Sequence, residues 1–221
     1  MKQFTPKAFF KLLLKGMPVL PGLCVVALVI SSISGISAQD MDVVNAIREL
    51  KDGYLIVRMP SSRAKIDTLT QMVNRSKDPG DKVKLQKMLK EASEERDSLI
   101  ADYTLAFKNR YNFSKVAYFM DYEVRDLPSA HFYTPDGSAV RWDDILKKPY
   151  YFLYFGRTDA SKIDALIIHD SSGEIVPRPF PNNFSTGGFN VLVVKILEKS
   201  FADWRIGKIN RKLHRFWDTV N

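Results

Sequence analysis

Cysteine is almost absent from this chain of 221 residues, which contains Cys24 and no other. Disulfide bonds need pairs of cysteines, and thiolates are the groups that bind structural zinc and carry thiol catalysis. The composition therefore excludes an intramolecular disulfide, CxxC redox chemistry and zinc sites built on cysteine.

Motifs of the common catalytic sites are missing as well. The chain has no glycine-rich phosphate loop, no G-x-S-x-G nucleophile elbow and no H-E-x-x-H metal helix. Its three histidines, His131, His169 and His214, fall in different predicted elements, and we expect each at a strand edge or on the surface. The sequence thus predicts no metal and no cofactor.

Acidic residues are absent from the first 38 positions, which contain four lysines, an apolar run at 23–30 and small residues after it. A basic segment followed by a short apolar segment and small residues is typical of a secretory signal peptide. We expect cleavage after Ala38, so that the exported protein begins at Gln39 and works in the periplasm or the outer envelope.

An uncleaved membrane anchor is the alternative interpretation, because residues 17–36 approach the ~20 residues of a membrane-spanning helix. Pro18, Pro21 and Gly35 interrupt this segment, and its continuous apolar stretch is short. The signal peptide is therefore favoured; under the alternative, the protein is anchored in the inner membrane.

The charge balance changes once residues 1–38 are removed. The remaining 183 residues carry 29 basic and 25 acidic side chains, so the net charge falls from +8 to +4. A chain of this length builds one domain with a sizeable core. So small a positive excess in an exported protein argues against nucleic acid as a partner.

The first half of this domain, residues 39–221, is expected to contain two strands joined by two helices. The expected order is a helix at 41–50, a strand at 54–59, a helix after Ser61 and Ser62, a longer helix at 81–110 and a strand at 115–122. A connection of this length predicts that the two strands are parallel and that the crossover is right-handed.

The second half is expected to be largely antiparallel, because short strands alternate with turns. The expected strands are 131–134, 150–155, 165–169 and 174–176, and a helix at 204–217 closes the chain. Together the two halves predict a mixed α/β fold, with a single sheet layered by helices on at least one face.

Three successive segments of the second half together form a pattern of strands and turns. They are FYTPDG at 132–137, VRWDDIL at 140–146 and YFLYFG at 151–156. This pattern resembles the opening of exported thioredoxin-like proteins, in which a CxxC motif follows the strand. The corresponding residues here are RTDA at 157–160, so a thioredoxin-like module would be inert in redox chemistry. The eight residues 157–164 are also too few for the crossover helix of that family.

Further motifs follow one another in order along residues 39–221. They are the strand 54–59, a helical pair, Tyr111-Asn112-Phe113 before a strand at 116–120, Pro179-Phe180-Pro181 and a basic C-terminal helix. This order resembles a family of exported Bacteroidota proteins without an assigned activity, and the Ala38-Gln39 junction is similar to signal peptides of that phylum. The resemblance implies export and a fold, and it implies no catalytic residues.

Two surface features are candidates for binding. The first is the loop 178–184, in which Arg178, Phe180 and Phe184 lie among prolines. A proline-restricted loop loses little entropy on binding, so exposed rings would serve as anchors. The alternative, which we favour, is that both rings pack onto the sheet.

The C-terminal helix is the second feature, because Trp204 and Trp217 accompany several basic residues. These are Arg205, Lys208, Arg211, Lys212 and Arg215. Such a helix can make a peripheral contact with an anionic membrane. It can also cover the sheet with its apolar face while its charges stay in water, and this second interpretation is favoured.

These observations favour an envelope accessory protein that binds another protein or a cell-surface component without turnover. An enzyme with a dispersed acid/base site is the alternative, with Asp143, Asp144, His169 and Asp170 as its candidates. Helix capping explains the first two carboxylates more simply, and a turn explains the last.

Overall fold

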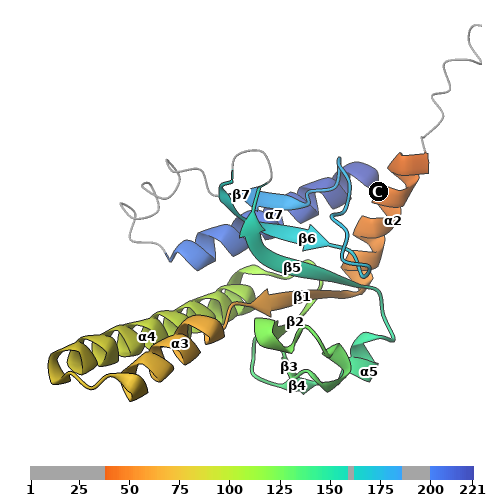
Figure 1. Cartoon of the computed structure of the whole chain (residues 1–221). Helices are drawn as coiled ribbons and strands as arrows, with labels where there is room; N and C mark the ends of the chain where they lie inside the picture. The colour runs from red at the N-terminus through yellow and green to blue at the C-terminus, as the bar shows by residue number, and fades with distance from the viewer. Residues whose placement is uncertain (1–37, 159–161, 186–199) are drawn as a thin grey trace, which may run out of the picture. The chain divides into compact units, whose positions relative to one another are not determined.

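Seven strands form one mixed sheet in the part of the chain that the computed structural model describes, residues 38–158, 162–185 and 200–221. Their order across the sheet is β4-β3-β2-β1-β5-β6-β7 (Figure 1). They are β1 (Tyr54–Met59), β2 (Lys115–Met120), β3 (Phe132–Tyr133), β4 (Ala139–Val140), β5 (Tyr150–Arg157), β6 (Asp164–His169) and β7 (Asn183–Ser185). The mixed α/β fold expected from the sequence is confirmed.

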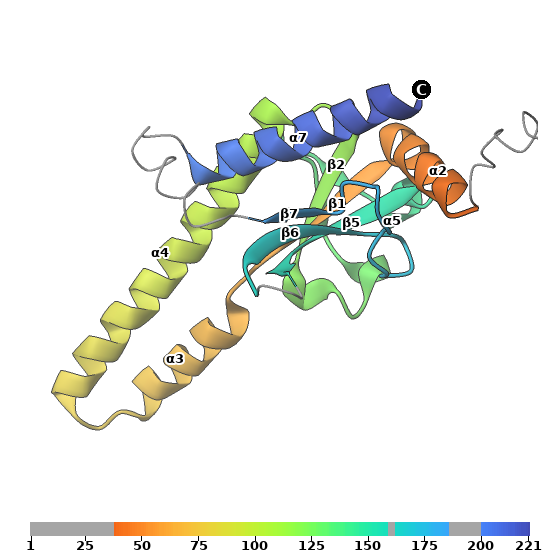
Figure 2. The same cartoon turned by 90° about the horizontal axis from the view of Figure 1, so that it is seen from above.

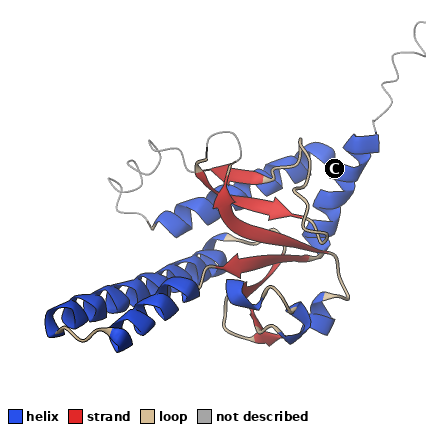
Figure 3. Ribbon diagram, viewed as in Figure 1, coloured by secondary structure: helices blue, strands red, loops and turns tan. Residues whose placement is uncertain are grey.

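Five α-helices accompany the sheet among the described residues (Figure 3). They are α2 (Ala38–Asp52), α3 (Arg63–Arg75), α4 (Pro79–Arg110), α5 (Trp142–Ile145) and α7 (Phe201–Val220), and the 3-10 turns η2 (Asp121–Glu123) and η3 (Leu127–Ser129) follow β2. Residues 1–37 of the expected signal peptide lie outside the described residues, and α2 begins at its last residue, Ala38. None of the helices in the described ranges is long and apolar enough to cross a membrane.

The central strand β1 is buried on both faces. Leu55, Val57 and Met59 have no exposed surface on one face, and Ile56 has none on the other. β1 pairs in parallel with β2 along its whole length. The parallel pair and its two-helix connection are therefore confirmed.

The second half of the sheet is antiparallel within itself, as predicted, but it joins the first half in parallel. β5 pairs with β6, and β6 with β7, in antiparallel fashion, whereas β5 runs parallel to β1. At the start of these strands, the N–H of Tyr54 donates to the carbonyl oxygen of Pro149 at 2.9 Å. A Cβ atom on Gly53 would lie 2.1 Å from that oxygen, so only glycine permits this approach of the two chains.

The strand expected at 174–176 does not form. Within this segment Ile175 makes a single isolated bridge to His169. The turn before it holds Gly173 at φ +88°, and the edge of the sheet beside β6 is taken by β7 instead. β7 pairs with Ala165, Leu166 and Ile167, so only the last residue of β6, His169, is left to bridge this segment.

Each face of the sheet has its own apolar core. On one face, α2, α4 and α7 pack against side chains of β1, β5 and β6 (Figure 2). On the other face, a smaller and more aromatic cluster joins Phe119, Phe132 and Phe152 to Ile145 of α5. Three long helices thus cover one face of the sheet. The other face is covered only by short elements, among them α5.

The helical hairpin of α3 and α4 extends beyond the sheet in both views (Figures 1 and 2). α4 has 32 residues, which corresponds to a length of about 48 Å. Its last turns carry Tyr103, Ala106 and Phe107 into the core, whereas the hairpin closes upon itself through Leu69, Val73 and Ala92. The outer part of the hairpin therefore projects away from the core.

Candidate functional site

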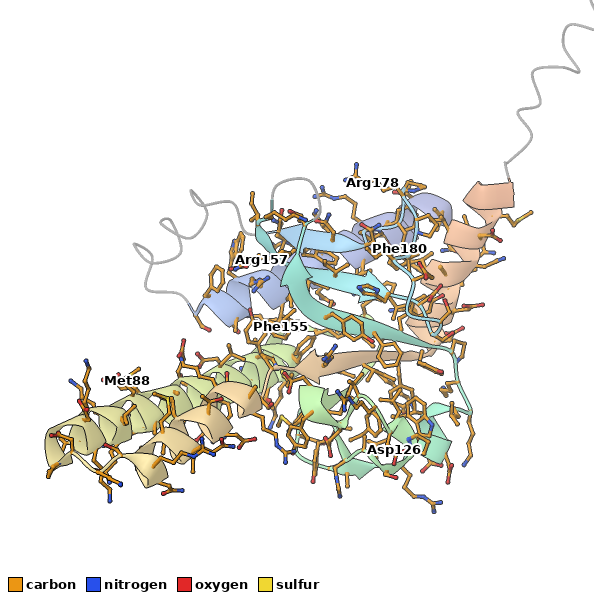
Figure 4. The ribbon with its side chains drawn as sticks, in the orientation of Figure 1. Met88, Asp126, Phe155, Arg157, Arg178 and Phe180 are labelled. Carbon is orange, nitrogen blue, oxygen red and sulfur yellow. The ribbon has the colours of Figure 1, made fainter. Side chains whose placement is uncertain are left out.

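The loop 178–184 holds its two phenylalanine rings inside the core. Phe180 is 1% exposed and Phe184 is 2% exposed. The ring centroid of Phe180 lies 6.4 Å from that of Tyr151 and 6.1 Å from that of Phe216, whereas Arg178 is exposed (Figure 4). The interpretation favoured from the sequence, that both rings pack onto the sheet, is confirmed, and neither ring is an exposed anchor. Phe184 lies in β7 and Phe180 packs under α7, so both rings serve the fold.

Helix α7 uses its apolar face to cover the sheet. Its buried residues are Ala202, Arg205, Ile206, Ile209 and Leu213. Trp204 and Trp217 are half-buried, and Trp217 packs against the same core. The favoured interpretation of this helix is confirmed, because the face that would enter a membrane is already occupied.

The carboxylates Asp143 and Asp144 are bound to neighbouring cations. Asp143 accepts a hydrogen bond from Arg141 at 2.8 Å, and Asp144 accepts one from Lys147 at 2.7 Å. Hydrogen bonding and charge from Lys147 lower the pKa of Asp144. Both residues lie in the first turn of α5, where negative charge favours the helix, although neither is the capping residue.

His169 and Asp170 are likewise engaged locally. The Nδ1 atom of His169 lies 2.9 Å from the carbonyl oxygen of Gly173, and its ring packs on Tyr154. Asp170 accepts hydrogen bonds from the N–H groups of Ser172 and Glu174, both at 2.9 Å. Across the described residues, no hydrogen bond or ion pair joins His169 to a carboxylate, and no three His, Cys, Asp or Glu gather as metal ligands.

A pocket of about 710 Å³ opens where the parallel strands β1 and β2 end. The end of β1, the start of α3 and the loop after β2 form its walls. The crevice outside the carboxyl ends of parallel strands is the usual ligand position in α/β sheets. We therefore take this pocket as the candidate functional site.

Cations predominate among the charged groups of the pocket wall. They are Arg58, Arg63, Lys65 and Arg125, against the carboxylates Asp67 and Asp121. Arg63 lies 3.6 Å from Asp67, and Lys65 lies 3.5 Å from Glu95 on α4. Asp121 accepts a hydrogen bond from the hydroxyl of Ser61. Among the described residues, Arg58 and Arg125 have no carboxylate partner.

Arg58 is the most firmly held of these cations, because it lies on the central strand. It is half-buried, and its guanidinium carbon lies 5.5 Å from the ring centroid of Tyr154. Burial raises the pKa of the Tyr154 hydroxyl, although Arg58 acts in the opposite direction. The hydroxyl therefore stays neutral at physiological pH, and Arg58 has no anionic neighbour on that side.

The N-terminus of α3 adds partial positive charge to the same wall. Ser62 precedes the helix with φ +51°, and its side chain makes no capping hydrogen bond. The N–H of Arg63 donates to the hydroxyl of Ser61 at 3.2 Å, whereas those of Ala64 and Lys65 have no acceptor among the described residues. Such unsatisfied N–H groups favour an anion nearby.

Glu123 fixes the loop that forms the far wall. It accepts hydrogen bonds from the N–H of Met120 at 3.1 Å, and from the N–H and Nδ1 of His131 at 3.2 and 2.9 Å. Burial acts to raise the pKa of Glu123, but these hydrogen bonds outweigh it and the pKa is lowered. The ionised carboxylate therefore ties together both ends of the loop that contains Arg125.

The arginines of the pocket wall provide groups that can bind an anion. A guanidinium presents several N–H donors in one plane, which match the oxygens of a carboxylate, sulfate or phosphate group. Arg58 was not among the predicted site residues, although the sequence contains a signal for it. It is the only charged residue in the otherwise apolar strand 54–59, directly before the break at Pro60.

The segment that resembled thioredoxin-like proteins forms β3, β4, α5 and β5, and β5 then pairs directly with β6, with Arg157 opposite Asp164. These strands form an antiparallel pair, as the short connection predicted. Comparison with known proteins gives no family: no family model, curated protein or solved structure matches this chain significantly.

Proposed function

We propose that the protein is exported to the cell envelope and acts there as a binding protein for an anionic ligand, which the pocket at the ends of β1 and β2 receives. Export is supported by the basic and apolar pattern of residues 1–38 and by the resemblance to exported Bacteroidota proteins. The ligand is the anionic group of an envelope protein or of a cell-surface component.

The proposal rests on the surroundings of two arginines, Arg58 and Arg125. Two arginines on the wall of one pocket lack a carboxylate partner among the described residues, and one of them is half-buried on a rigid strand. Buried cations are normally paired, because removing a charge from water without compensation is costly. An anionic ligand would provide this compensation.

Isothermal titration calorimetry tests the proposal, with inorganic phosphate and citrate as the ligands. The variants are Arg58→Gln and Arg125→Gln, and Arg141→Gln is the matched control because Arg141 is an exposed arginine away from this pocket. We expect Arg58→Gln to weaken binding about tenfold or more, which corresponds to one lost charged hydrogen bond. The control should bind like the wild type.

Absence of binding of both ligands to the wild type would refute the proposal. Equal affinities of the Arg58→Gln and Arg141→Gln variants would refute the assignment of the pocket. Thermal unfolding of all three variants distinguishes loss of the site from loss of the fold.

A further inference from the structure

Positive charge is concentrated at the end of the helical hairpin, which we call the hairpin tip and define as residues 72–90. These residues include six basic and two acidic side chains, a net charge of +4. The whole of residues 39–221 also has a net charge of +4. Basic and acidic residues therefore balance over the rest of the domain. Because Glu91 and Glu94, directly beyond the tip, pair with two of its lysines, the excess of the tip that stays uncompensated is +2.

Several of these cations have no counter-charge. Lys87 and Lys90 form ion pairs with Glu91 and Glu94 one turn further along α4, at 3.9 and 3.7 Å. The other four basic residues of the tip have no ion pair among the described residues; they are Arg75, Lys77, Lys82 and Lys84. All four are exposed.

Apolar side chains lie exposed among these cations. Met72, Val83 and Met88 are 48%, 66% and 43% exposed, and Val83 is the most exposed large apolar residue in the described ranges. Lys84 and Met88 are one helical turn apart on α4, as are Val83 and Lys87, so lysines and apolar side chains lie side by side. Figure 4 shows Met88 on the projecting part of the hairpin.

The hairpin tip is held out from the core by well-formed local structure. Asp78 caps α4 by accepting a hydrogen bond from the N–H of Asp81 at 2.9 Å, and Pro79 occupies the first position of the helix. Leu69 and Ala92 are buried directly behind the tip, and Val73 is buried within it. The tip is therefore an ordered surface at the end of a rigid projection.

We propose that the hairpin tip docks on an anionic lipid bilayer, with its unpaired cations among the headgroups and with Val83 and Met72 in the interfacial layer. Exposed apolar side chains surrounded by lysines are the combination that interfacial binding requires. Three of the four unpaired cations are lysines, which act as point charges without the planar geometry that a specific protein partner exploits. Mobile lipid headgroups can rearrange around such dispersed charges. This proposal does not depend on the pocket or on its ligand.

Cosedimentation of the full chain with lipid vesicles tests the docking. One set of vesicles contains phosphatidylglycerol and phosphatidylcholine, and the other contains phosphatidylcholine alone. The difference between the two sets measures the anionic component, and any part of it that comes from the four lysines of residues 1–38 is shared by all variants. The tip variant is Lys82→Gln/Lys84→Gln, and the matched control is Arg211→Gln/Lys212→Gln, which removes the same charge from exposed positions of α7.

We expect the anionic component to fall about thirtyfold in the tip variant, since each cation near an anionic surface contributes about fivefold. The control should retain the wild-type value. Val83→Ser leaves the charge unchanged and should also reduce binding, whereas added salt should weaken the wild type more than it weakens the tip variant.

Two results would overturn the proposal. If both double variants lose the anionic component equally, the binding reflects net charge and not the tip. If the wild type sediments no better with anionic vesicles, the tip has no lipid partner and an acidic protein becomes its expected ligand. Circular dichroism of each variant verifies that the hairpin is still folded.

Discussion

Replacement of Phe180 by alanine should destabilise the fold strongly, because the ring is a core element. It is 1% exposed and lies in the larger core, between Tyr151 and Phe216. Truncation of a buried phenylalanine costs about 3–5 kcal/mol, and two ring contacts place this one near the middle, at about 4 kcal/mol. Against a typical total of about 5–15 kcal/mol, the variant should be close to unfolding.

Urea unfolding followed by circular dichroism measures this loss. Arg178→Ala is the matched control, because Arg178 is exposed in the same loop and should change the free energy of unfolding by less than about 0.5 kcal/mol. The slope of the unfolding transition should be unchanged in both variants. A loss below about 1 kcal/mol for Phe180→Ala would refute the packing argument, and an exposed binding ring would then be the better explanation.

Three further predictions concern a close contact, a carboxylate and export. Gly53→Ala should lower the free energy of unfolding by about 3 kcal/mol, because its Cβ would overlap backbone oxygens. The matched variant Gly207→Ala, in the interior of α7, should raise the free energy of unfolding by about 0.5–1 kcal/mol. Melting temperatures measure both changes. The lowered pKa of Glu123 means that its ionised form stabilises the fold above its ordinary pKa and that this contribution is lost as the pH falls through the lowered value. Glu123→Gln should therefore be less stable than the wild type at neutral pH, by about 1–2 kcal/mol, and the difference should shrink in acid unfolding curves. Sequencing of the protein from its native host should give Gln39 as the first residue, and a chain that keeps Met1 in the inner membrane would establish the anchor.

The sequence predicted those elements whose own residues determine them. β1 has the predicted bounds, 54–59, because Tyr54, Ile56 and Val57 favour a strand and Pro60 ends it. The two-helix connection was equally evident, since Asp78, Pro79 and Gly80 separate two periodic segments. Local signals of this kind determine an element without any knowledge of its tertiary contacts.

The parallel placement of β5 beside β1 could not be predicted, because it depends on a contact between Gly53 and Pro149, residues far apart in the sequence. The pocket was missed for the same reason. Arg58 and Arg125 are separated by the whole helical hairpin, and the pairing of β1 with β2 brings their segments together. Ring burial in the loop 178–184 was the favoured prediction, because large apolar side chains are usually buried, whereas the helix that covers Phe180, α7, could not be predicted from the loop itself.

The helical hairpin has a consequence for how this protein can change during evolution. All hydrogen bonds and ion pairs of residues 69–95 join positions within α3, α4 and the turn between them. Whole helical turns can therefore be inserted into both arms, or deleted from both, without altering the register of β1 and β2. Homologous chains should tolerate length variation here and nowhere else in the crossover. The distance between the pocket and the far end of the hairpin would then be a freely adjustable dimension of the molecule.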